Sequence, residues 1–494
     1  MTTRTTTSYE AQYQRFVLSN KDYGQQFCHM YSQRISQMKE MLSGCIKEWQ
    51  EKDSKLQLLP HIIDSESQVE EDCIIVGTLY KEMENKPSII DDYADGGGVG
   101  LGKKNIKGVR NFTSDSDSLI LEDDSGRAKL KGMENVTGDL VTGVTIAVLG
   151  QVGSDGLFHV KDWKSSGETL KSQNDSSNSS SSSSSRSSNE KRSILLVSGL
   201  EIGSEDTSLV SVQLLIDFIS GRLGGENEKN ISKSIVRVII AGDSMKHVDK
   251  NISIDRFSNP TESKKLVQEN ELQQAHISRK TDTIIAQIAA TCPIDIMPGM
   301  NDPANFAMPQ QPIHSCLLPQ SARFSTTGFV TNPYQAKFDN TCVVLGHSGQ
   351  PIHDMILQVN EYRENDNNDN NEMEIDNNNE GSSNDNKENS DTKKNTKSKS
   401  TINLLKKSLQ WGHIAPTAPD SLSCYPYLKE DPFVMEDAPD IFFAGNQDQY
   451  ESDTFTNKIG HTTRIICVPS FKTTHQVVLV DLDTLESTPI TFNA

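Results

Sequence analysis

The chain has 494 residues, 34% of them hydrophobic, and its 48 Lys and Arg against 68 Asp and Glu give a formal net charge of −20. A chain of this length is expected to form about two or three domains. Because binding to duplex DNA through phosphate neutralisation requires a basic surface, the acidic balance argues against non-specific polyanion binding. No apolar run reaches the roughly 18 residues of a spanning helix, so we predict no membrane segment.

The eight cysteines are scattered along the chain, and no two of them form a C-x-x-C pair. A zinc ribbon or a disulfide scaffold would need clustered cysteines. The pattern therefore favours reduced, mostly buried thiols in an intracellular protein. It offers no metal or cofactor site.

The first half of the chain predicts two ordered units. Residues 9–50 carry apolar side chains at helical spacing, including Phe27, Tyr31 and Met38, and are expected to form an amphipathic helical arm. Such an arm most often packs on its own domain, although docking of a partner is the alternative. Residues 55–163 contain about five short strands, which indicates a small closed barrel of the OB type or another small β-barrel.

The second half predicts a larger unit with two low-complexity stretches. Residues 164–192 include an uninterrupted serine run and are expected to be a disordered linker. Strands then alternate with helices over residues 193–494, which favours a layered α/β domain. Residues 360–400 are dominated by Asn, Asp, Glu and Lys, and we expect a disordered insertion there.

Short segments that contain glycine or polar residues follow several of the predicted strands of this α/β domain. Because the carboxyl ends of parallel strands converge on one crevice, these residues are expected to lie near each other. The positions are Ser198, Leu200, Asp243, Met300, Asn301, Asp302, His347, Asn446 and Asp448.

The order of these strand ends resembles that of the calcineurin-like metallophosphoesterases. The resemblance implies a layered α/β fold and a two-metal site for phosphoryl chemistry. Most ligands of that family are replaced here. The replacements are Ser198 for Asp, Leu200 for His, Met300 for the Asn ligand, Asn301 for the catalytic His, and Asn446 and Asp448 for two His.

The remaining positions match the family in part. Asp243 is retained, His347 matches a lone His, and Asp302 matches an acidic position that is not usually a ligand. Since the side chains of Leu200 and Met300 cannot bind a hard metal, we predict an inactive domain without metal. Asp243 is expected to have a structural role, and all nine residues are interpreted as vestigial positions with no catalytic residue among them.

An OB barrel followed by such a domain is similar to the B subunits of replicative DNA polymerases, and shorter motifs resemble those of the small subunits of DNA polymerase delta. These motifs are Tyr13–Phe16, Phe27–Arg34, Val76–Tyr80, Leu140–Gly143, Met297–Gly299, Pro309–Pro312, Thr331–Ala336, Pro416–Leu422, Cys424–Pro426 and Asp431–Phe433. The resemblance implies a nuclear, non-catalytic scaffold in DNA replication and repair synthesis. Its implied partners are the C-terminal metal-binding domain of the catalytic subunit and a third subunit, which binds the sliding clamp.

Two alternatives remain open at this point. One is an active metal-dependent phosphodiesterase or exonuclease with unusual ligands. The other is a B subunit of polymerase alpha or epsilon, against which the N-terminal motifs and Thr417–Asp420 argue. The barrel segment offers Tyr80, Phe158, Lys129 and Lys131 without dense basic and aromatic interleaving. We therefore expect any DNA contact to be weak or indirect.

Overall fold

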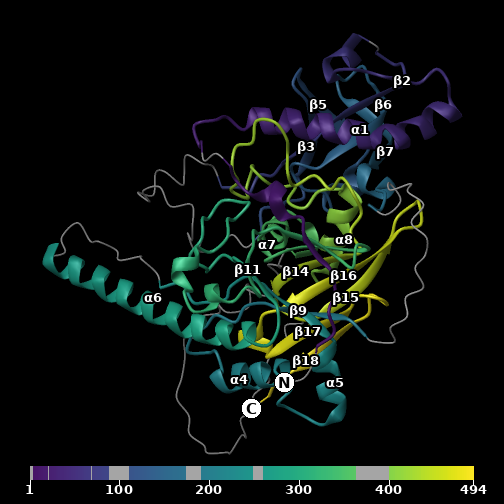
Figure 1. Cartoon of the computed structure of the whole chain (residues 1–494). Helices are drawn as coiled ribbons and strands as arrows, with labels where there is room; N and C mark the ends of the chain where they lie inside the picture. The colour runs from purple at the N-terminus through teal and green to yellow at the C-terminus, as the bar shows by residue number, and fades with distance from the viewer. Residues whose placement is uncertain are drawn as a thin grey trace, which may run out of the picture.

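The architecture comes from a computed structural model. It describes residues 4–19, 22–67, 69–87, 111–173, 191–248, 260–362 and 400–493. In the helix that starts at Pro260, side chains are described from residue 268 onward. A barrel crossed by one long helix lies at one end, and a larger α/β body holds both ends of the chain (Figure 1). Most of the linker and of the insertion that we predicted to be disordered lies outside the described residues. The prediction of a linker from residue 164 is wrong, because the last barrel strand runs to Ser165 and a short helix follows over Ser166–Thr169. None of the described helices has the length and apolar character needed to cross a membrane.

Six strands form the barrel, and pairing of β3 with β6 closes it. The strands, in the order in which they pair, are β2 (Gln57–Leu58), β3 (Cys73–Glu82), β4 (Ser118–Glu122), β5 (Arg127–Lys131), β7 (Phe158–Ser165) and β6 (Thr145–Val152). Short helices accompany them, namely η2 (Ile62–Ser67), α3 (Glu134–Thr137) and η3 (Ser166–Thr169). The sequence predicted these strands except for the short β2.

The N-terminal helix is shorter than predicted. It is α1 (Cys28–Lys52), whereas the residues before it form the strand β1 (Tyr9–Ala11) and the turn η1 (Tyr13–Phe16). The strand β1 pairs antiparallel with an edge strand of the body, β12 (Tyr334–Phe338). The prediction of helix from residue 9 is therefore wrong, because an exposed sheet edge offers unpaired main-chain groups that favour strand addition.

Two six-stranded sheets form the body. The first runs β1, β12, β13 (Cys342–His347), β14 (Ile441–Gln447), β16 (Thr462–Pro469) and β15 (Glu451–Thr456). The second runs β11 (Thr327–Phe329), β10 (Ile294–Met297), β9 (Ile235–Ala241), β8 (Ser193–Val197), β17 (Gln476–Asp481) and β18 (Ser487–Thr491). The central strands of each sheet are parallel, and their near-continuous apolar sequences fit burial on both faces.

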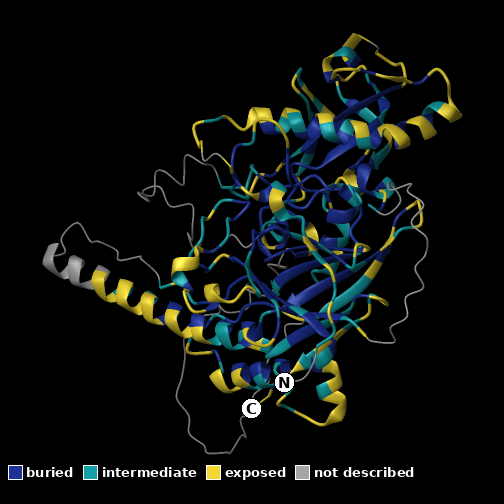
Figure 2. Ribbon diagram, in the orientation of Figure 1, coloured by how far each residue is buried: buried dark blue, intermediate teal, exposed yellow. Residues whose placement is uncertain are grey.

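Helices cover the outer faces of both sheets. The second sheet carries α4 (Leu209–Ile219), α5 (Glu226–Ser234) and α6 (Pro260–Ala289), and the first sheet carries α7 (Gln350–Ile356) and α8 (Ile402–Trp411). Shorter helices lie in the connections, namely η4 (Ser315–Leu317), η5 (Ser321–Arg323), η6 (Asn360–Tyr362) and α9 (Phe471–Thr474). Part of α6 extends from the body with mostly exposed residues (Figure 2).

The barrel and the body share one hydrophobic core. Leu121 and Phe158 of the barrel belong to the same buried cluster as Leu404 of α8 and Phe442 of β14. A second cluster lies between the two sheets, with Phe338 and Phe443 among its members. Burial of apolar surface contributes roughly 25 cal/mol per Å² to stability. Since the barrel and the body bury such surface against each other in one continuous core, the same burial that stabilises the fold also fixes their relative placement.

A buried arginine joins the helix α1, the barrel and the body. The guanidinium of Arg34 is fully buried, and its Nε lies 2.6 Å from Asp431 Oδ2. Its Nη1 donates to the carbonyls of Gly143 (3.1 Å) and Pro416 (3.0 Å), and its Nη2 donates to that of Ala418 (2.6 Å). Gly143 has a φ of 92°, and a Cβ there would lie 1.8 Å from the Pro416 oxygen, so the approach requires glycine.

The carboxylate of Asp431 is also fully satisfied. It accepts hydrogen bonds from His413 Nε2 (3.1 Å) and from the Phe433 main chain (3.0 Å), while its own N–H donates to Gln37 of α1. Burial opposes its charge, but Arg34 and His413 hold the Asp431 pKa well below its usual value. Burial and the charge of Arg34 lower the pKa of His413 to about 4, so its ring is neutral at pH 7.

We predict that Arg34→Ala lowers the free energy of unfolding by about 3–5 kcal/mol, because it leaves the buried Asp431 carboxylate without its cation. Denaturant unfolding of the full chain measures this loss. Arg127→Ala is the matched control, since Arg127 pairs with Glu122 on the surface with 69% of its side chain exposed, and about 1 kcal/mol or less is expected there. Equal stability of the two variants would contradict a role of Arg34 in joining the three parts.

Candidate functional site at the strand ends

The carboxyl ends of β8, β9, β10, β13 and β14 lead into connections that meet at one edge of the body. The structure brings together five of the nine predicted positions there, either in direct contact or through a shared neighbour. They are Ser198, Asp243, Asn301, Asp302 and Asn446. The prediction that strand ends converge is confirmed for these five.

Asp243 contacts Asn301 rather than facing open space. Its Oδ1 accepts from the Asn301 main chain at 2.8 Å, and its Oδ2 accepts from Asn301 Nδ2 at 3.2 Å. The turn that places it is tight, because Gly242 and Asp243 have φ values of 87° and 52°. A Cβ on Gly242 would lie 2.3 Å from Ser348 Cβ, so the close approach of two loops requires glycine.

Asp302 ties two of these loops together. Its carboxylate accepts from the main-chain N–H groups of Ser244, Met245 and Gly299, and from the Ser244 hydroxyl at 2.6 Å. Both oxygens are therefore occupied by donors of the chain. A carboxylate in this setting holds loops in place and has little capacity left to bind a substrate or metal.

Ser198 and Asn446 complete the contact between the two sheets. Ser198 Oγ accepts from the Asn446 main chain at 3.0 Å and donates to the carbonyls of Val468 and Pro469. Asn446, with a φ of 55°, donates its side-chain amide to the Ser348 carbonyl at 2.8 Å. These bonds join strand ends of different sheets through neutral groups.

The side chains of the other four predicted positions take no part in these hydrogen bonds, although Leu200 and Met300 lie in the same loops. Leu200 is a core residue, 2% exposed, whereas Met300 is 47% exposed. Asp448 is exposed on the surface. His347 is fully buried against Phe442, and its Nδ1 accepts from the Gly349 main chain. Burial lowers the pKa of His347 to about 3, so it is neutral at pH 7.

A buried amide network beside the crevice was not predicted. Asn332 Nδ2 lies 2.8 Å from Gln310 Oε1, 2.7 Å from Ser348 Oγ and 3.0 Å from Gln350 Oε1. Gln310 in turn donates to the Gly299 carbonyl at 3.0 Å. The only signal in the sequence was the recurrence of Gln and Asn next to prolines in the 309–312 and 331–336 motifs.

The electrostatics of the crevice centre on Asp243. Burial, and then the nearby charge of Asp302, raise its pKa to about 7.

A group of side chains close enough to share a metal ion lies on the barrel instead. Among the described residues, the His, Cys, Asp and Glu side chains that meet this criterion are His61, Asp123 and Asp124. Asp123 there already accepts from three main-chain N–H groups, those of Ile62, Ser125 and Gly126.

Comparison with known proteins gives matches over both halves of the chain. Residues 26–163 match the family described as the OB-fold domain of the DNA polymerase delta subunit, and residues 194–454 match the family of the B subunit of DNA polymerase alpha/epsilon.

Three curated relatives align over almost their whole length. The DNA polymerase delta small subunit of Oryza sativa subsp. japonica is 35% identical, over 97% of this chain and 96% of the relative. That of Arabidopsis thaliana is 33% identical, over 99% and 96%. The DNA polymerase delta subunit 2 of Drosophila melanogaster is 32% identical, over 100% and 99%. The chain belongs to the family of DNA polymerase delta small subunits.

Proposed function

We propose that this accessory subunit of DNA polymerase delta is a scaffold that has lost the chemistry of its α/β domain. It bridges the C-terminal metal-binding domain of the catalytic subunit and a third subunit, through which it meets the sliding clamp. It acts in the nucleus, in DNA replication and repair synthesis. An active phosphoesterase and a B subunit of polymerase alpha or epsilon are not favoured, because relatives over the whole length are named as delta subunits.

The proposed domain organisation has an OB barrel over residues 55–163 that the ordered residues 164–169 of β7 and η3 extend, a linker over the rest of 164–192, and a phosphoesterase-type domain over 193–494 with an insertion at 360–400. Two packed sheets with helices on their outer faces support a layered phosphoesterase-type domain. The shared core of barrel and body supports a single rigid unit within which these domains do not move independently.

The observation that carries the proposed loss of chemistry is the pairing of the crevice side chains with one another. Asp302 accepts four donors of the chain, and Asp243 accepts two from Asn301. A two-metal site needs several free carboxylate and imidazole ligands around one space. Here His347 is fully buried with its Nδ1 bonded to the Gly349 main chain, and Leu200 and Met300 supply no ligand atom for a hard metal.

Exposed apolar side chains next to the crevice support docking of a protein. They are Val17, Tyr23, Phe27, Met300, Phe306 and Leu428, which we call the apolar rim. The segments that carry them lie side by side, because the Tyr23 ring packs on Tyr425 at 5.3 Å and the Tyr425 main chain donates to Met308. Exposed apolar residues in such a group are typical of protein interfaces.

The charges of the barrel favour a protein partner over DNA. Each Lys and Arg in the described barrel strands β3 to β7 has an acidic partner within 4.0 Å, as in the pairs of Lys129 with Glu82 and Lys131 with Asp155. Binding of single strands relies on a groove of unpaired cations with stacked aromatic side chains. This pairing supports weak or indirect DNA contact.

We predict that Asp243→Asn leaves assembly of the polymerase intact and stabilises the chain more at pH 8 than at pH 5. The pKa of Asp243 is about 7 when folded and 3.8 in its usual setting, so the wild-type loses stability as the pH rises through this interval. Asn resembles the protonated acid, and the gain should exceed about 1.4 kcal/mol, the equivalent of one pKa unit. Denaturant unfolding at both pH values measures it.

Asp448→Asn is the control, since substitutions at exposed positions usually change the free energy of unfolding by no more than about 0.5 kcal/mol. Loss of assembly by Asp243→Asn at normal stability would contradict a purely structural role for Asp243.

The scaffold role predicts that charges placed on the apolar rim weaken binding of the catalytic subunit. Tyr23→Asp and Phe306→Asp change side chains that are 56% and 52% exposed, so the fold should tolerate them. Because truncating an aromatic anchor of an interface often costs about 2 kcal/mol, we expect binding to weaken about thirtyfold. Co-purification of the co-expressed subunits and calorimetry measure this change.

Ile459→Asp is the matched control, since Ile459 is 49% exposed in the turn between β15 and β16 and lies outside the rim. An unchanged complex with both rim substitutions would refute docking on this surface.

A further inference from the structure

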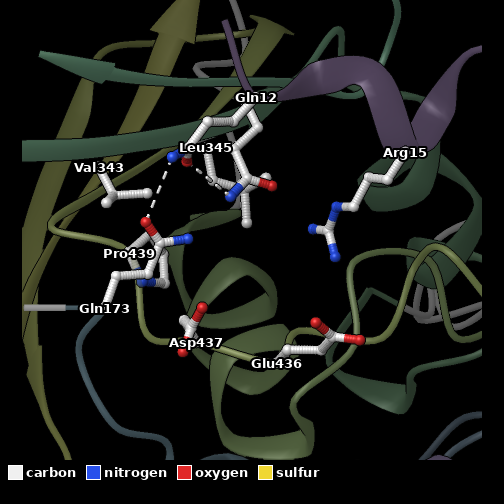
Figure 3. Close-up of a pocket in the computed structure, with 9 residues that line it drawn as sticks. Gln12, Arg15, Gln173, Val343, Leu345, Glu436, Asp437 and Pro439 are labelled. Carbon is white, nitrogen blue, oxygen red and sulfur yellow. Dashed lines mark hydrogen bonds between the residues drawn. The ribbon is translucent and has the colours of Figure 1, made fainter. Parts of the chain in front are cut away.

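A polar cavity of about 190 Å³ lies where the N-terminal segment crosses the first sheet (Figure 3). One water needs about 10–15 Å³ of such space, so the cavity can hold a larger group. It lies outside the strand-end crevice and shares no residue with the apolar rim. Neither the fold nor the proposed scaffold role assigns it a use.

One side of the cavity is apolar. Val343 and Leu345 alternate along β13 and therefore face the same side of the sheet, and Pro439 lies beside them (Figure 3). Aliphatic chains pack against such a surface. The cavity therefore offers a wall for the methylene stem of a long side chain.

The opposite side carries an excess of negative charge. Glu436 and Asp437 turn their carboxylates toward the same space as the guanidinium of Arg15 (Figure 3). Neither carboxylate forms a hydrogen bond or an ion pair within 4.0 Å with any of the residues that the structure describes. Two acids and one cation leave one negative charge uncompensated, which favours a cationic guest.

Two polar atoms around the cavity lack partners among the described residues. Arg15 Nε and Gln335 Oε1 are both shielded from solvent and form no hydrogen bond. The neighbouring amides hold each other loosely, since the contacts from Gln335 to Gln12 and from Gln12 to Gln173 are both 3.4 Å long. A buried donor and a buried acceptor without partners each cost free energy. After small side-chain rotations, a guest carbonyl could accept from the donor and a guest N–H group could donate to the acceptor, which would remove this cost.

We propose that this cavity binds a lysine or arginine side chain of another protein, together with the main-chain amide next to it. The stem packs on Val343 and Leu345, and the cationic head pairs with Glu436 and Asp437. Arg15 Nε donates to the guest carbonyl. The inference goes beyond the scaffold role, because the recognition is the same whichever protein carries the side chain.

The probes are Nα-acetyl-arginine N-methylamide, its lysine counterpart and, as a neutral isostere, the citrulline compound. Each is titrated into the purified full chain and followed by saturation-transfer NMR. We expect both cationic probes to bind at least fivefold more tightly than the citrulline probe. Equal affinities, or no binding of the cationic probes at all, would overturn the proposal.

Two variants with opposite expected effects test the residues. Glu436→Gln with Asp437→Asn should weaken binding of the arginine probe about tenfold, since it removes both carboxylates. Gln335→Glu should strengthen it, because it adds a negative charge at a nearly isosteric side chain. Glu271→Gln, at an exposed acid of α6 outside the cavity lining, is the control and should change nothing.

An equal loss in the Glu271→Gln control would show that the probe responds to surface charge in general, and it would overturn the proposal. Weaker binding by Gln335→Glu in a normally folded variant would also contradict it. Thermal unfolding of each variant checks folding. Because no other subunit takes part, failure here leaves the scaffold role untouched.

Discussion

The ion pair of Arg34 with Asp431 is the contact on which the arrangement of this molecule depends. The helix α1, the barrel and the loops around residues 413–433 meet at one guanidinium with no exposure to solvent. A buried charge without its partner is strongly unfavourable, so the three parts are stable only when they are assembled together. The continuous core around this pair contributes the apolar part of the stability, and the ion pair selects one relative placement of the helix, the barrel and the loops.

In the strand-end crevice, neutral groups instead of a cation satisfy the buried carboxylates. In a metal site, cations would neutralise the carboxylates and hold the loops. Here Asn301, Ser244 and main-chain N–H groups satisfy Asp243 and Asp302 directly. The proposal of a scaffold rests on this replacement, which keeps the loops in place and leaves the neighbouring apolar rim available for protein contacts. Burial still disfavours the charged form of Asp243 and raises its pKa.

Much of the architecture was predictable because it depends on local patterns. Alternating apolar residues indicated the strands of the barrel, and the apolar runs before Ser198, Asp243 and Asn446 indicated buried parallel strands. The helix predicted from residue 9 failed since β1 depends on a sheet edge more than 320 residues away in the sequence, as in the pairing of Tyr9 with Phe338. Patterns within one segment contain no information on such pairing.

The site was predictable only in part for the same reason. The convergence of strand ends followed from topology, but the hydrogen bonds between Asn332, Gln310 and Gln350 depend on side-chain orientations that no spacing rule supplies. The most direct measurement of the central claim is elemental analysis of the purified full chain by mass spectrometry. The proposed scaffold without metal-dependent chemistry predicts far less than one transition metal ion per chain. Two tightly bound ions per chain would contradict it.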